Sequence, residues 1–230
     1  MAAMRQHWFF DFDGTLCDTE ADIKSAWRAA LHNIGRDCPQ FDRVYRTGPT
    51  LDQVVYMLFD DATPALVDAV KAQFRTCYDA SGFPATHPYP WVPAWLADLK
   101  RQGCRIYVAT NKRWNPTRLL MAKLGWDVLF DGYYSFDMFV DSAATSAAAP
   151  VMAATRVALP RKALSKAELL TEVMRQRGIV PADAVMVGDT KGDVTAGAAA
   201  GMYTIGCTWG YGTREELEGA DEIYDAERFA

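Results

Sequence analysis

Two aspartates, Asp11 and Asp13, follow a short apolar run that ends at Phe10. In a strand, side chains two residues apart project from the same face, and the Gly14-Thr15 pair lets the backbone turn sharply beside them. One carboxylate of such a pair can attack an electrophile while the other exchanges a proton with the leaving group. Two close carboxylates also repel each other, and a divalent cation would relieve that repulsion. On this segment alone, an acidic turn that caps a helix is an equal alternative.

Polar side chains also stand at the ends of two later strand-like runs, 105–110 and 184–187. They are Thr110, Asn111 and Lys112 at the end of the first run, and Asp189 and Asp193 after the second. Open α/β sheets bind ligands at the carboxyl ends of their parallel strands. Each cluster alone is also compatible with a helix cap. Three such clusters in one chain favour a functional site.

The elements that must position these side chains alternate between strands and helices. This alternation predicts an α/β fold with a Rossmann-like, doubly wound parallel sheet. After the first strand, however, apolar residues recur only at helical spacing, over 20–35, 51–59 and 63–78. No strand-like run intervenes before residue 105, and a Gly- and Pro-rich passage ends the helical block.

We therefore expect two domains. Residues 1–16 and 89–230 would form the α/β core, and residues 17–88 would form a small all-helical domain inserted into it. A chain of 230 residues, half of them apolar, can bury one full core and a smaller second one.

Charge and cysteine content limit the classes of partner. The formal net charge of -5 argues against nucleic acid or an acidic membrane surface, because both require a basic patch. The five cysteines are scattered and lack CxxC spacing, and the three histidines are dispersed, so neither a zinc site nor a disulfide framework is expected. Without a membrane-length apolar run or a signal peptide, the sequence predicts a cytoplasmic protein.

The chain resembles the haloacid dehalogenase superfamily of phosphatases. The superfamily's four ordered motifs match Asp11-Phe-Asp13-Gly-Thr15-Leu16, then Thr110-Asn111-Lys112, then a later lysine, then Gly188-Asp189-Thr190-x-x-Asp193. The helical block resembles the first-type cap of this superfamily. Segments 46–51, 88–92, 208–217 and 219–223 resemble phosphoglycolate-phosphatase-like members, so the likeness extends over nearly the whole chain.

This resemblance implies a phosphoryl-transfer mechanism. Asp11 would be the nucleophile that forms an aspartyl-phosphate, and Asp13 would protonate the leaving oxygen and then activate water. The Thr110 side chain, the Asn111 backbone and a lysine would hold the phosphoryl oxygens.

The resemblance also implies bound Mg²⁺. Asp11, Asp189 and the Asp13 carbonyl would be its ligands, because this cation suits a few carboxylates together with phosphate and water. Asp193, one helical turn after Asp189, would reach the same ion or orient its ligands.

Two lysines compete for the phosphate-binding role. Lys166 is preferred because Ser165 and Glu168 have the spacing of a capping box, which places Lys166 at the start of a helix over 167–177. Lys162 is the rival, since an Ala-rich segment at about 141–161 departs from the family pattern and shifts the register. That segment is either a surface insertion or a flap over the site. Two other lysines, Lys112 and Lys191, are expected to be charges at the rim.

The expected function is Mg²⁺-dependent hydrolysis of a small phosphorylated metabolite by a monomer or homodimer, as in phosphoglycolate-phosphatase-like enzymes. Asp13 disfavours a dehalogenase, which expels halide and needs no acid for an ester oxygen. A nucleotidase and a sugar-phosphate phosphatase remain alternatives. From a different functional class, a catalytically silent ligand-binding protein on the same fold also remains open.

Overall fold

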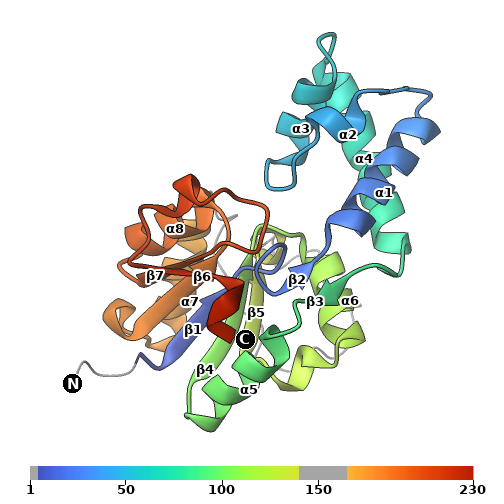
Figure 1. Cartoon of the computed structure of the whole chain (residues 1–230). Helices are drawn as coiled ribbons and strands as arrows, with labels where there is room; N and C mark the ends of the chain where they lie inside the picture. The colour runs from blue at the N-terminus through green and yellow to red at the C-terminus, as the bar shows by residue number, and fades with distance from the viewer. Residues whose placement is uncertain (1–4, 140–164, 230) are drawn as a thin grey trace. The chain divides into compact units, whose positions relative to one another are not determined.

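The computed structural model describes residues 5–139 and 165–229. Lys162 and the Ala-rich segment 141–161 lie outside these ranges. The chain divides into two compact units (Figure 1). One contains the chain up to Cys17 and from Pro88 onward, and the other is Asp18–His87.

The first unit is built on a six-stranded parallel sheet with the strand order β5-β4-β1-β6-β7-β8. The strands are β1 (His7–Phe10), β4 (Arg105–Thr110), β5 (Gly132–Ser135), β6 (Ala184–Gly188), β7 (Tyr203–Cys207) and β8 (Glu222–Tyr224). Phe10 near the end of β1 pairs with Val108 on one side and Val187 on the other. The strands β1, β4 and β6 therefore end at the same edge of the sheet. The predicted α/β fold class is confirmed.

Helices cover both faces of this sheet (Figure 1). They are α5 (Val92–Arg101), α6 (Trp114–Lys123), α7 (Lys166–Arg177) and α8 (Lys191–Ala199). Neighbouring residues of β1 show the alternation: Phe9 belongs to the core under α7 and α8, whereas the Phe10 ring meets Trp95 of α5, with ring centroids 5.2 Å apart. Because the central strands are buried on both faces, their sequences are almost uninterruptedly apolar.

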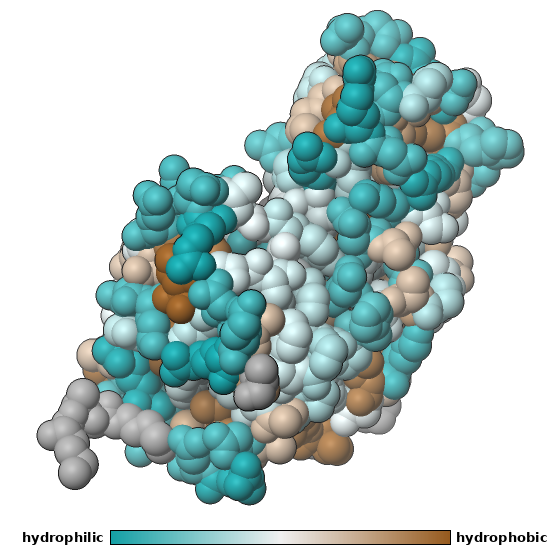
Figure 2. Space-filling model, in the orientation of Figure 1, coloured by the Kyte–Doolittle hydropathy of each residue, from teal (hydrophilic) through white to brown (hydrophobic). Residues whose placement is uncertain are grey.

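Short 3₁₀ turns complete this unit. They are η1 (Trp126–Val128), η2 (Phe136–Phe139), η3 (Pro181–Asp183), η4 (Glu215–Leu217) and η5 (Ala226–Phe229). No helix in the described ranges is long and apolar enough to cross a membrane. On the face that Figure 2 shows, hydrophobic residues lie in separate patches among hydrophilic ones.

The second unit is helical. Its helices are α1 (Glu20–Asn33), α2 (Phe41–Val44), α3 (Leu51–Leu58) and α4 (Pro64–Ala80). Trp27 of α1 is fully buried, and the centroid of its ring lies 4.8 Å from the ring centroid of Phe74 in α4. Thr63 caps α4 by accepting a hydrogen bond from the Leu66 N–H, with proline in the first helical position.

The two points where the chain passes between the units are extended. They form the short strands β2 (Cys17–Asp18) and β3 (His87–Pro88), which pair with each other. Just outside them, the Tyr89 N–H donates to the Leu16 carbonyl at 3.1 Å.

Candidate active site

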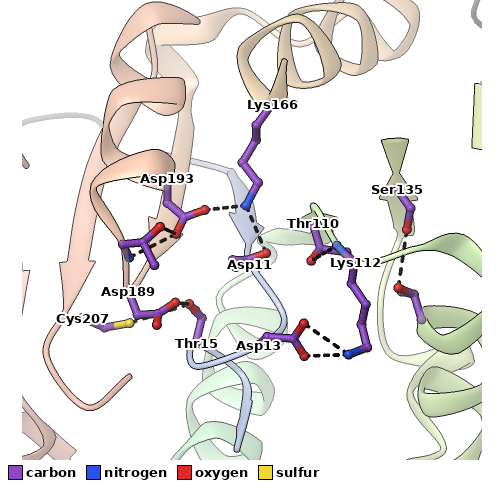
Figure 3. Close-up of polar contacts among 12 residues, drawn as sticks. Asp11, Asp13, Thr15, Thr110, Lys112, Ser135, Lys166, Asp189, Asp193 and Cys207 are labelled. Atoms are coloured by element: carbon purple, nitrogen blue, oxygen red, sulfur yellow. Dashed lines mark hydrogen bonds and ion pairs between the residues drawn. The ribbon is translucent and has the colours of Figure 1, made fainter. Parts of the chain in front are cut away.

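Three strand ends bring the candidate side chains together. Asp11 follows β1, Thr110 ends β4 and Asp189 follows β6. In the sheet, β1 lies between β4 and β6. The strands β4 and β5 lie on one side of β1, and the later strands β6, β7 and β8 lie on its other side. Such a switch point is where open α/β sheets bind ligands. Figure 3 shows the side chains converging there.

Asp11 is held in a buried, charged environment. Its Oδ1 atom is inaccessible to solvent and lacks a well-formed hydrogen bond within the described part of the chain, although Lys166 Nζ lies 3.0 Å away as an ion-pair partner. Burial is the main cause that raises the pKa of Asp11 to about 6; Lys166 opposes this rise, and the charges of Asp193 and Asp13 contribute to it. A buried carboxylate oxygen whose contact is an ion pair can attack an electrophile or bind a cation.

Lys166 stands at the first position of α7, where Ser165 caps the helix by accepting from the Glu168 N–H at 3.2 Å. Its ammonium group pairs with Asp11 and, at short range, with Asp193. Burial alone would lower the pKa of Lys166, but the two carboxylates outweigh burial and raise it. The ammonium group therefore stays charged at neutral pH.

Asp193 uses both of its carboxylate oxygens. Oδ1 pairs with Lys166, and Oδ2 accepts from the Thr190 N–H at 3.2 Å and the Thr190 hydroxyl at 2.7 Å. Thr190 and Asp193 form a capping box at the start of α8, in which each side chain accepts a hydrogen bond from the backbone N–H of the other residue. This arrangement fixes Lys166 relative to the segment that follows β6.

Asp189 is fully buried, and two groups that sequence reasoning missed hold it. The Thr15 hydroxyl donates to Oδ1 at 3.0 Å, and the Tyr211 N–H donates to Oδ2 at 2.7 Å. Burial, together with the charges of Asp193 and Asp11, raises the pKa of Asp189 to about 8 against the lowering effect of these hydrogen bonds. The Gly-x-Gly pattern of 210–212 after an apolar run was the available sequence signal for this loop.

Three carboxylates could hold a metal ion. Asp11, Asp189 and Asp193 each offer one oxygen, and these oxygens all lie within 4.8 Å of one another. The pKa values of Asp11 and Asp189 are raised, first by burial and then by repulsion between the neighbouring carboxylates. Hard oxygen ligands and an unsatisfied Asp11 oxygen fit a cation such as Mg²⁺. We call these three carboxylates the acidic cluster; the Asp13 carboxylate does not belong to it.

Asp13 instead points toward Lys112 (Figure 3). Lys112 Nζ lies 2.8 Å from Oδ1 and 3.2 Å from Oδ2 of Asp13. The expectation that Lys112 lies at the rim is wrong, since its side chain is only 4% exposed. The Lys112 N–H bonds to the Thr110 hydroxyl, and this turn directs the side chain inward. Asn111 and Lys191 are exposed.

Comparisons with known proteins identify a matching family model and several relatives. A family model described as haloacid dehalogenase-like hydrolase matches residues 7–201. The chain is 31% identical over 211 residues to a phosphoglycolate phosphatase of Neisseria meningitidis, covering 88% of this chain and 80% of that protein. It is 29% identical over 212 residues to the tyrosine-protein kinase PtkA of Mycobacterium tuberculosis, covering 91% of this chain but only 64% of that protein. A crystal structure of a predicted phosphatase from Clostridium acetobutylicum shares the fold, with a TM-score of 0.77, 22% identity and coverage of 98% and 96%.

Proposed function

The chain belongs to the haloacid dehalogenase-like hydrolases, and we propose that it hydrolyses a small phosphate monoester through an aspartyl-phosphate on Asp11. The observation that carries the proposal is the buried Asp11 oxygen beside Lys166, at the switch point of the sheet. The similarity to a phosphoglycolate phosphatase supports this class of substrate.

In the first step, an Asp11 oxygen attacks phosphorus, the bond from phosphorus to the leaving oxygen breaks, and Asp13 gives that oxygen a proton. In the second step, Asp13 takes a proton from a water molecule whose oxygen attacks the aspartyl-phosphate. Inorganic phosphate leaves and the Asp11 carboxylate returns. Lys166, Thr110 and the Asn111 backbone N–H would hold the phosphoryl oxygens during both steps.

Mg²⁺ is the proposed cation. Asp11, Asp189 and the Asp13 carbonyl would bind it. Asp193, which pairs with Lys166 and Thr190, would reach the same ion or orient its ligands. When bound, the ion supplies the positive charge that offsets repulsion between the Asp11 carboxylate and the phosphate.

We also propose that the helical unit, Asp18–His87, is a cap that selects the substrate. A cap over the site would favour small metabolites over phosphoproteins or nucleic acids. A cytoplasmic location and a monomeric or homodimeric state remain predictions from the sequence.

The test combines a substrate panel with Asp11→Asn. The panel contains phosphoglycolate, nucleoside monophosphates, hexose phosphates, p-nitrophenyl phosphate and a phosphotyrosine peptide, assayed with Mg²⁺. We expect Asp11→Asn to reduce kcat by at least about 10³-fold, because it removes the covalent route. Asp68→Asn, at an exposed site on α4, is the matched control.

Phosphate release will be measured, and circular dichroism will verify that both variants fold. If the wild type turns over none of these esters, the proposed function is wrong. If Asp11→Asn keeps more than a few per cent of the activity, Asp11 is not the nucleophile.

A further inference from the structure

Lys112 is a buried lysine that the proposed mechanism does not use. Both ends of the residue are tied to the site: its N–H bonds to the Thr110 hydroxyl at 3.1 Å, and its ammonium group contacts both Asp13 oxygens. The side chains of Lys112 and Asp13 are 4% and 21% exposed. Taking a lysine out of water is unfavourable unless it is paired, and here the pairing involves a candidate acid/base group.

The site thus contains two separate lysine–aspartate systems. Lys166 pairs with Asp11 and Asp193, whereas Lys112 pairs with Asp13 (Figure 3). Without Lys112, the Asp13 carboxylate would lose the partner that fixes its direction. A carboxylate released in this way could rotate toward Lys166 or toward the cation ligands.

We propose that Lys112 is a positioning residue that holds the Asp13 carboxylate apart from the acidic cluster and available to the leaving-group oxygen. The proposal rests on the proposed function, because it takes Asp13 as the acid/base. In this role Lys112 fixes the position of the Asp13 carboxylate, whereas Lys166 contacts the proposed nucleophile Asp11.

Rates on esters whose leaving groups differ in basicity distinguish a positioning role for Lys112 from a purely structural role. An alkoxide is a poor leaving group and needs a proton from Asp13 as the ester bond breaks. A p-nitrophenolate is stable as an anion and leaves without one. Displacing Asp13 should therefore lower kcat/KM far more for alkyl phosphates than for p-nitrophenyl phosphate, because kcat/KM reports the steps up to the departure of the leaving group and not the later attack of water.

The experiment compares Lys112→Met with Lys191→Met, which removes the same charge at an exposed position on α8. Each variant will be assayed on p-nitrophenyl phosphate and on the best alkyl phosphate of the panel. For Lys112→Met we expect kcat/KM on the alkyl ester to fall by about 10²–10⁴-fold, with kcat/KM on the aryl ester changed little. Lys112→Arg, which keeps a charged partner for a carboxylate, should restore part of the loss.

A double-mutant cycle tests whether Lys112 acts through Asp13. In the Asp13→Asn background, Lys112→Met should cause no further loss on the alkyl ester. Equal losses of kcat/KM on both esters, no loss on either, or additive losses in the double variant would each overturn the proposal while leaving the phosphatase function intact. A wild type inactive on every ester would overturn both. If Lys112→Met fails to fold, Lys112→Gln replaces it with the same expectations.

Discussion

At the scale of single residues, the packing around Asp189 leaves no room for larger side chains. A Cβ atom on Gly210 would lie 2.3 Å from Asp189 Cβ and 2.4 Å from the Gly14 carbonyl oxygen. A Cβ on Gly212 would lie 2.1 Å from the Asp189 carbonyl oxygen. Only glycine fits at these positions without moving the backbone. The loop after β7 therefore fixes the carboxylate on which metal binding is proposed to depend.

Weakening this support should reduce the affinity for Mg²⁺. Thr15→Val removes the hydroxyl that donates to Asp189 Oδ1, and Gly210→Ala displaces the loop. Partners that orient metal ligands typically contribute about 10- to 100-fold in affinity, so we expect the Kd to rise by that range. Isothermal titration of metal-free protein with MgCl₂, in the absence of substrate, measures the effect.

Gly219→Ala is the matched control for this titration, since the nearest atom to a Cβ there is 3.9 Å away. Unchanged affinity in both Thr15→Val and Gly210→Ala would show that the loop does not support the metal ligands.

Spacing and motif order pointed to most of the candidate site residues but not to their partners. The structure brings Asp11, Asp189 and Asp193 together, and Lys166 lies beside them. Their roles stay predictions until they are tested. Lys112 was misplaced because a sequence does not show which way a side chain turns after a strand. The Tyr211 contact was missed because it joins residues 22 positions apart through the sheet order.

At the scale of elements, regular patterns explain which helices and strands the sequence predicts. The bounds of the helices α1, α3 and α4 differ from the expected bounds by at most two residues, because each helix has an apolar face and a clear beginning or end. The helix α2 has only four residues, too few to show a helical period. The strand β8 has three residues, and it becomes recognisable only beside β7.

The amino ends of the strands, at the edge opposite the site, have their own polar anchor. Asp131, just before β5, accepts from Lys100 Nζ of α5 at 2.8 Å. It also accepts from the guanidinium group of Arg105 and the N–H of Ile106 in β4, each at 2.9 Å. One carboxylate thus joins a helix and two strands.

Replacing this anchor should reduce stability without affecting catalysis. We expect Asp131→Asn to lower the free energy of unfolding by about 1–3 kcal/mol, because it weakens charge-assisted hydrogen bonds. Burial alone would raise the pKa of Asp131, but the hydrogen bonds from Lys100, Ile106 and Arg105 outweigh burial and hold the pKa below 3.8. The stabilisation is therefore present above about pH 4 and is lost as the pH falls through the folded-state pKa.

Urea unfolding at pH 7 and pH 3, followed by tryptophan fluorescence, tests this expectation. The stability difference between the wild type and Asp131→Asn should shrink at pH 3, whereas Asp68→Asn should match the wild type at both pH values. A difference that stays constant between the two pH values would contradict the assignment.

At the scale of the whole molecule, the two units have separate apolar interiors. Trp27 and Phe74 are buried in the helical unit, whereas Phe9, Tyr107 and Leu169 belong to the core between the sheet and α7. The chain leaves and re-enters the sheet-containing unit at one place, because the Tyr89 N–H donates to the Leu16 carbonyl. The helical unit is therefore an insertion whose removal leaves two adjacent chain ends.

This closeness of the chain ends makes the proposed cap testable by replacement. Because Leu16 and Tyr89 are joined by a 3.1 Å hydrogen bond, a short Gly-Ser linker can stand in for residues 18–87 without stretching the sheet-containing unit. The replaced segment contains none of the described side chains that form the candidate active site, namely Asp11, Asp13, Lys112, Lys166, Asp189 and Asp193. Hydrolysis of a small aryl phosphate should therefore persist. If the helical unit selects substrates, the ratios of kcat/KM among small esters should move toward one, and the phosphotyrosine peptide should gain activity relative to phosphoglycolate. Circular dichroism and thermal melting must first show that the shortened protein folds. Unchanged kcat/KM ratios in a folded shortened protein would mean that the helical unit takes no part in substrate selection.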